Sequence, residues 1–242
     1  MRRRGSGPAS WLRLLLAAAV LSFPGTAGAG ELGPLLERIE RAYGTVTQPN
    51  SILQRGRTLS HSRGEGTLLR AYRGAERFRI EIRYRSGVET RIIDGPAAWQ
   101  SSKPMSEAFR GALILQAARV ALPWNLLAAR ERLRDGGEQR LGDVRLHFVE
   151  MPLGDNLRMV AEVDPESGRI LRSRGILIHP GGSEMVFGTV YEDFRTTDGR
   201  LYAAVEHHYA MGRYIGRSVI ESVEYDTPIA DSLFRPEIPG LI

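Results

Sequence analysis

The sequence predicts an α+β fold built on one antiparallel sheet of about eleven strands. Two observations lead to this prediction. Short β-rich runs recur along the chain with turn residues between them, which is typical of a sheet that curls into a sandwich or barrel. Two further stretches carry apolar residues at the spacing of helices. These helices are enough to plug one concave face of such a sheet, but they cannot cover both faces.

The first residues have the layout of an export signal rather than of a folded element. Three arginines follow the first residue, an apolar run extends from Leu14 to Phe23, and Ala27–Ala29 supplies small residues for cleavage. This layout is typical of a secretory signal peptide, and the apolar run is too short to span a bilayer. We therefore expect residues 1–29 to be a signal peptide and residues 30–242 to form one exported domain. The alternative is a short membrane anchor that is never removed.

The charge and the cysteine content exclude several classes of protein. The formal net charge of +5 falls to +1 without the leader, which holds four arginines and no acid. Basic composition therefore gives no reason to expect a nucleic-acid partner. The chain has no cysteine, so an exported domain must be held by its packed core alone. It also lacks the cysteine that would anchor a lipid, and we expect a protein released in soluble form.

The first third of the chain predicts one helix and then strands. From Leu32 to Val46 apolar residues recur at spacings of three and four, and Gly44 is placed to end this amphipathic helix. From about Ile52 the period changes. The runs TLLRAY, RFRIEIRY and ETRIID are β-rich and are separated by glycine-containing turns, which predicts about five antiparallel strands.

Between Ser106 and Leu133 the pattern is helical again. FRGALILQAARVAL is apolar on most of its circumference, with two arginines as its only charges, and Pro123 breaks it before WNLLAARERL. A helix of this kind must be buried. It is either a core helix packed under a sheet or a lid over an open barrel. In the second case an apolar chamber suited to acyl chains would be lined by Leu113, Ile114, Leu115, Trp124, Leu126 and Leu127.

After Gly136-Gly137 the sequence predicts about six more strands. They are VRLHFVEM, LRMVAEVD, RILRSRGILI, EMVFGTVYEDF, LYAAVEHHYA and YIGRSVIESVEYD. Turn residues such as Asp164-Pro165 and Asp198-Gly199 fall between them. No linker, low-complexity tract or repeat divides the chain, which favours one domain.

No motif predicts catalysis or metal binding. His207 and His208 are adjacent, so in a strand they point to opposite faces and one metal ion cannot readily take both. There is no GxSxG elbow, no cysteine nucleophile, and no glycine-rich phosphate loop. We therefore expect no catalytic residue, no metal, no cofactor and no nucleic-acid partner. A hydrolase acting on an envelope polymer is left as the weakest alternative.

Five phrases along the chain resemble those of one known family. They are RAYRGAERFRIEI, IIDGPAAWQSS, LPWNLLAA, VDPESGRILRS and the ending VYEDFRTTDGRLYAAVEHHY through DTPIADSLFRP. In this order they resemble the periplasmic outer-membrane lipoprotein-sorting carriers, which have the LolA/LolB-like fold. The resemblance covers nearly all of the chain after the leader. It implies an unclosed antiparallel β-barrel whose concave side is covered by helices.

The resemblance also implies a function. It points to a monomeric periplasmic carrier that binds the acyl chains of lipoproteins or lipids in a hydrophobic cavity for transport towards the outer membrane. Machinery in the inner and outer membranes would be its partners. The alternative is an envelope-stress sensor or scaffold that binds a membrane protein through the same fold. Besides the six helix residues, the residues expected to contact the ligand are Phe78, Ile80, Ile82 and Trp99.

The carriers of this family hold the lid with an arginine just ahead of a phenylalanine. Arg73 is the match here, ahead of Phe78, with Gly74 where the family has a proline. Arg70 and Arg77 are the alternatives for this role.

Overall fold

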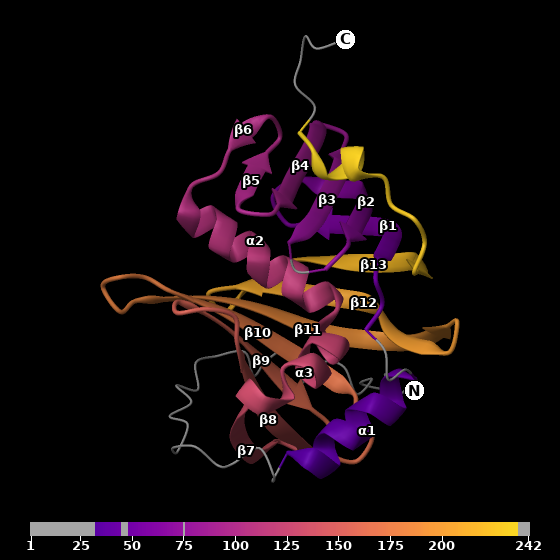
Figure 1. The fold of residues 1–242 in the computed structure, drawn as a ribbon, viewed down its shortest axis with the longest axis vertical. Coiled ribbons are helices and arrows are strands. Elements are labelled where there is room, and N and C mark those ends of the chain that lie inside the picture. The colour runs from indigo at the N-terminus through magenta and orange to yellow at the C-terminus, as the bar shows by residue number, and fades with distance from the viewer. Residues whose placement is uncertain (1–31, 45–47, 75, 237–242) are drawn as a thin grey trace, which may run out of the picture.

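A computed structural model describes residues 32–44, 48–74 and 76–236 (Figure 1). The expected signal peptide of residues 1–29 lies outside the described residues, and so does Val46 at the expected end of the first helix. The described residues form one antiparallel sheet with helices on one of its faces. The α+β class and the single unclosed antiparallel sheet are therefore confirmed.

The sheet has thirteen strands rather than the expected eleven. In chain order they are β1 (Ile52–Ser60), β2 (Gly64–Tyr72), β3 (Arg77–Tyr84), β4 (Gly87–Asp94), β5 (Ala97–Gln100), β6 (Lys103–Pro104), β7 (Arg134–Leu141), β8 (Val144–Pro152), β9 (Leu157–Val163), β10 (Ile170–Ile178), β11 (Glu184–Thr197), β12 (Arg200–Ala210) and β13 (Arg213–Tyr225).

The strand count was wrong because two edge strands carry little β signal. β6 has only two residues, and β7 has the sequence RDGGEQRL, whose glycine pair reads as a turn. In the structure the register with β8 shifts between Asp135 and Glu138, so the glycines form a bulge inside the strand. Polar, bulged and very short strands are common at sheet edges because they discourage pairing with another chain.

The order of the strands leaves the sheet open. It runs β6-β5-β4-β3-β2-β1-β13-β12-β11-β10-β9-β8-β7, so neighbouring strands of the sheet are also consecutive in the chain, except at one point. That point is the pairing of β1 with β13, which joins the N-terminal half of the sheet to the C-terminal half. The helical segment connects the two free edges, β6 and β7, and crosses one face of the sheet between them (Figure 1).

The first helix forms as its apolar spacing predicts. Helix α1 (Gly33–Tyr43) buries Leu35, Leu36 and Ile39 on one side. Gly44 ends it in the left-handed conformation, with φ of 76°, and donates its N–H to the carbonyl of Glu40. This helix packs on α3 and β12.

The apolar middle segment forms two helices, α2 (Glu107–Val120) and α3 (Leu122–Ala128), followed by a 3₁₀ turn, η2 (Arg130–Arg132). The chain bends by 92° between them. Pro123 lies in the first turn of α3, where its missing N–H costs nothing. Within the described residues no single helix is long and apolar enough to cross a membrane, and only this bent pair passes that test jointly.

The sheet buries α2 from two sides, which explains why the helix is apolar nearly all round. Leu113 and Ala117 pack into a cluster with β1, β2 and β3, while Leu115 and Ala118 pack into a second cluster with β8, β9 and β10. Ile114 contacts both clusters. A third cluster lies under the C-terminal 3₁₀ turn η3 (Asp231–Phe234), which packs on β3 and β4.

Gly56 is a sensitive point of the sheet. A Cβ added there would lie 2.0 Å from the carbonyl oxygen of Val219, at the register shift between β1 and β13. This carbonyl belongs to the pairing that joins the two halves, so it cannot move without cost. We expect Gly56→Ala to lower the free energy of unfolding by about 3 kcal/mol and Tm by about 6–12 °C, as measured by thermal denaturation.

The control is Gly33→Ala, since a Cβ at Gly33 meets nothing within 4 Å. Its Tm should equal that of the parent or lie slightly above it. A Gly56→Ala protein that melts with the parent would contradict the proposed role of this close approach.

Candidate functional site

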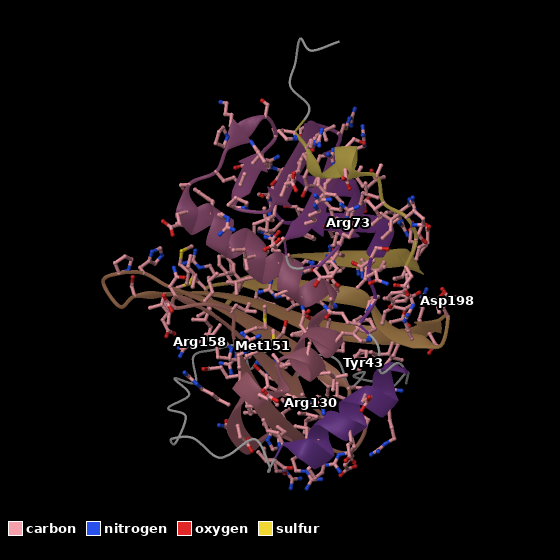
Figure 2. The ribbon with its side chains drawn as sticks, viewed as in Figure 1. Tyr43, Arg73, Arg130, Met151, Arg158 and Asp198 are labelled. Carbon is pink, nitrogen blue, oxygen red and sulfur yellow. The ribbon has the colours of Figure 1, made fainter. Side chains whose placement is uncertain are left out.

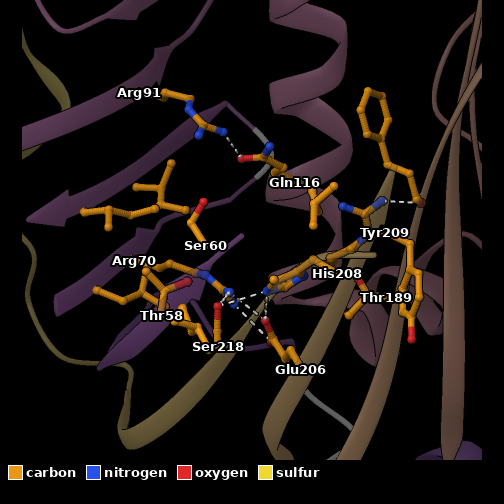
Figure 3. Close-up of a pocket in the computed structure, with 18 of the residues that line it drawn as sticks. Thr58, Ser60, Arg70, Arg91, Gln116, Thr189, Glu206, His208, Tyr209 and Ser218 are labelled. Atoms are coloured by element: carbon orange, nitrogen blue, oxygen red, sulfur yellow. Dashed lines mark hydrogen bonds and ion pairs between the residues drawn. The ribbon is translucent and has the colours of Figure 1, made fainter. Parts of the chain in front are cut away.

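A cavity of about 200 Å³ lies between α2 and the face of the sheet that the helix crosses (Figure 3). Strands β1, β2, β3, β11, β12 and β13 form most of its wall, and Gln116 and Arg119 reach it from α2. Residues far apart in the chain thus meet here because β1 pairs with β13. We take this cavity as the candidate binding site.

One wall of the cavity is apolar. Phe78, Ile80 and Ile82 occupy alternate positions of β3 and therefore share a face, and Leu68 of β2 extends this surface. The first three are among the residues expected to contact a ligand. The structure places them together on the cavity wall, where contact with a ligand stays a prediction.

The remaining expected ligand contacts lie elsewhere. Leu113, Leu115, Leu126 and Leu127 are buried in the two clusters on either side of α2 and do not line this cavity. The lid segment is therefore packed against the sheet over most of its length.

Three other expected residues border other parts of the molecule. Trp124 makes edge-to-face contacts with two tyrosines and lines a second, smaller cavity of about 50 Å³. Ile114 lines a hollow of about 590 Å³ between α2, α3 and the ends of β2 and β8. Trp99 packs on the opposite face of the sheet, in the cluster under η3.

Arg73 holds the C-terminal segment in this structure. It donates to the carbonyl of Ile229 at 3.0 Å, forms an ion pair with Asp231, and lies over the ring of Phe234. In Figure 2 it lies in the half of the molecule that contains the N-terminal strands, far from Tyr43 of α1. Its expected role as the lid-holding arginine stays a prediction, because among the described residues the side chain of Arg73 forms its hydrogen bonds with Ile229 and Asp231 and not with α1, α2 or α3.

Other arginines fasten α2 to both halves of the sheet. Arg91 of β4 donates to Gln116 at 3.2 Å, and Arg110 donates to the carbonyl of Gly95 at 3.2 Å. On the other side Arg119 donates to the carbonyl of Phe187 at 2.7 Å. The helix is thus tied by few polar contacts, and two of them come from residues that line the cavity.

The cavity also has a charged side, centred on Arg70 and Glu206. Arg70 donates to both carboxylate oxygens of Glu206, at 3.0 and 2.5 Å. Burial disfavours the charged carboxylate, but the attraction and hydrogen bonds of Arg70 outweigh it and hold the pKa of Glu206 below its ordinary value. Both groups are therefore ionised near neutral pH and neutralise each other.

His208 belongs to this charged side, while His207 does not. His208 lies 2.9 Å from the hydroxyl of Ser218, and burial lowers its pKa to about 4, opposed by Glu206. His207 points to the other face, beside Glu192. The prediction that the two histidines face opposite sides is confirmed, but the sequence did not reveal that His208 reaches a cavity.

The cluster of His208, Ser218 and Glu206 does not have the geometry of a serine hydrolase triad. Glu206 lies 3.7 Å from Nε2 of His208, the same nitrogen that faces Ser218, whereas a triad places its carboxylate on the other ring nitrogen. Ser218 is also 2% exposed and lies within 3.4 Å of Arg70. In the described part of the chain no three histidine or carboxylate side chains are grouped as metal ligands.

Comparisons with known proteins support the fold. No protein-family model matches the sequence, and no curated protein matches it. The structure is similar to the crystal structure of LolA superfamily protein NE2245 from Nitrosomonas europaea, with a TM-score of 0.55 and 13% identity over 87% of this chain and 98% of that chain. A DUF1329 family protein from Desulfovibrio piger gives a TM-score of 0.49 and 8% identity, over 86% and 98% of the two chains. The expected LolA-like fold is confirmed, and at such low identity the likeness concerns the fold alone.

His208 makes the stability depend on pH. Since its pKa in the folded protein lies below the ordinary 6.5, the unfolded chain binds a proton first as the pH falls, and stability is lost from about pH 6.5 towards pH 4. Between pH 7 and pH 5 this loss is about 2 kcal/mol. We expect His208→Gln to remove it, so that Tm falls by about 4–8 °C less than in the parent over this range.

The control is His61→Gln, at an exposed position in the turn between β1 and β2, which should leave the parent's pH dependence in place. An unchanged fall of Tm in His208→Gln would show that His208 is not held neutral in the folded protein.

Proposed function

We propose that this protein is a carrier that binds the acyl chains of lipoproteins or lipids between its sheet and α2. The observation that supports this proposal is the cavity under α2, with the apolar wall formed by Leu68, Phe78, Ile80 and Ile82. Binding requires no chemical step, only removal of apolar surface from water. This removal is worth about 0.8 kcal/mol per CH₂ group.

The cavity must enlarge to take a whole chain. A cavity of about 150 Å³ accommodates a molecule of the size of benzene, so the present volume of about 200 Å³ holds only a short piece of an acyl chain. The movable part is α2, because its polar ties to the sheet are few and its apolar contacts are interchangeable with those of a ligand. An acyl chain that replaces Leu113 against β3 exchanges one apolar contact for another.

The expected export signal supports a place in the periplasm, and the LolA-like fold supports transport towards the outer membrane. Loading and unloading by machinery in the two membranes belong to the same proposal. The alternative of an envelope-stress sensor or scaffold uses the same fold, and a stable protein partner recovered from a lipid-depleted extract would favour it over the carrier.

The apolar wall gives a direct test. Ile80→Trp fills the cavity from a half-buried position on β3, so we expect it to weaken binding of a fluorescent acyl probe at least 10-fold. The control is Val88→Trp, at a position 52% exposed and outside the cavity, which should bind as the parent does. Equal affinity of Ile80→Trp and the parent would place the acyl chain elsewhere.

The natural ligand can be identified without assumptions about its head group. We expect the protein purified from its native envelope to release acyl-containing molecules into organic solvent, as detected by mass spectrometry. A clean extract, together with no binding of the acyl probe by the parent protein, would contradict the carrier proposal.

A further inference from the structure

The cavity under α2 contains a positive charge that no carboxylate balances. Arg91 pairs with Glu89, and Arg70 pairs with Glu206 through both oxygens. Arg119 has only the carbonyl of Phe187 as a hydrogen-bond partner, and no ion pair with it occurs among the described residues. Since burial lowers the pKa of His208 to about 4, this histidine is neutral near pH 7 and leaves the charge count unchanged.

Two hydrogen-bonding groups at this side of the cavity lack partners. The Nε of Arg119 is buried, and no acceptor in the described part of the chain lies within hydrogen-bond distance of it. The hydroxyl of Thr189, a residue that is 2% exposed and labelled in Figure 3, is likewise buried without a partner. Buried polar groups are nearly always hydrogen-bonded, so two such groups beside one cavity point to a ligand that accepts from both.

The sheet leaves space for the guanidinium of Arg119. A Cβ on Gly175 of β10 would lie 2.9 Å from Nη2 of Arg119 and 3.1 Å from Cβ of Leu115. A side chain at position 175 would therefore displace the guanidinium of Arg119 from its place against β10. Glycine is unfavourable inside a strand, so its presence here fits a position that must accept another side chain closely.

The two sides of the cavity match the two ends of an amphiphile. The apolar residues come from β2 and β3, whereas Arg119 and Thr189 lie by β10 and β11, on the C-terminal half of the sheet. We propose that the ligand carries a single anionic group, a carboxylate or phosphate, which accepts hydrogen bonds from Arg119 and Thr189 while its acyl chain lies against Phe78 and Ile80.

This inference rests on the proposed acyl-binding function and narrows it. An acyl chain joined to a protein by an ester or amide bond carries no charge at its carbonyl end and would leave Arg119 unbalanced. A free fatty acid or a lipid with one phosphate next to its chain would balance it. Both of these ligands have an anionic group attached to an acyl chain.

The test compares ligands that differ in the charge of the head group and in the presence of an acyl chain. Palmitate, methyl palmitate, palmitoyl lysophosphatidate and inorganic phosphate each compete with an uncharged fluorescent acyl probe on the full chain. We expect palmitate or the lysophosphatidate to bind about 10- to 100-fold more tightly than the methyl ester, because charge-assisted hydrogen bonds are lost with the ester. Whichever of the two binds more tightly identifies the head group as carboxylate or phosphate.

Variants of Arg119 and Thr189 test whether these two residues cause the preference for the acid over the ester. Arg119→Gln should bring the affinity ratio of acid to ester close to one. Thr189→Val should reduce the ratio roughly five-fold while folding as stably as the parent, because it removes a buried hydroxyl that has no partner. The control is Arg110→Gln, which also loosens α2 but lies outside the cavity, and it should keep the parent's ratio.

Equal binding of palmitate and its ester by the parent, or an unchanged preference in Arg119→Gln, would overturn the inference and leave acyl binding intact. Competition by inorganic phosphate as strong as that by palmitate would also overturn it, since no chain would then be needed. If neither the acid nor the ester displaces the probe, the carrier proposal itself fails.

Discussion

The structure depends on one constraint: most of α2 is too apolar to be exposed, so a single sheet must pack against it from two sides. A flat sheet covers only one side of a helix. This sheet covers two, because β1 pairs with β13 and brings the N-terminal strands round to face the C-terminal ones across α2. The helical segment connects the two free edges, β6 and β7, which do not pair with each other. The open edges of the sheet and the burial of the helix are therefore linked.

A helix inserted in this way leaves the site with a mixed character. The leucines of α2 pack into the clusters on either side of it, and the main cavity lies where Gln116 and Arg119 stand on the helix. Polar side chains on the facing strands follow from this, since Arg119 in a purely apolar environment would be very costly. Arg70, Glu206 and Thr189 provide that polar surface, while β3 stays apolar. The site is thus suited to a molecule with two different ends more than to a hydrocarbon alone.

Much of the fold could be predicted from local patterns, because local patterns reflect which face of an element is buried. The spacing of Leu35, Leu36 and Ile39 predicts α1, and the alternation in RFRIEIRY places Phe78, Ile80 and Ile82 on one face. The sequence did not predict the bulged edge strand β7, because a solvent-facing edge needs no apolar residues. The sequence did not reveal the charged side of the site, because its members come from distant parts of the chain. Arg70 and Glu206 are 136 residues apart, and the pairing of β1 with β13 brings their strands together. One signal was visible, an arginine at position 119 inside a largely apolar helix.

The position of Arg119 links ligand charge to the movement of α2. Gln116 and Arg119 lie three residues apart and so share one side of the helix, but they bind opposite halves of the sheet, through Arg91 and through the carbonyl of Phe187. An anion beside Arg119 competes with that carbonyl, and a charged acceptor is the stronger of the two. Arg119 and Glu206 also line both the main cavity and the smaller one beside Trp124, so this arginine borders both spaces. The same ion pair that fixes the head of the ligand would therefore loosen the helix on the C-terminal side and extend the room for the acyl chain, while Arg91 and Arg110 keep the helix attached on the N-terminal side.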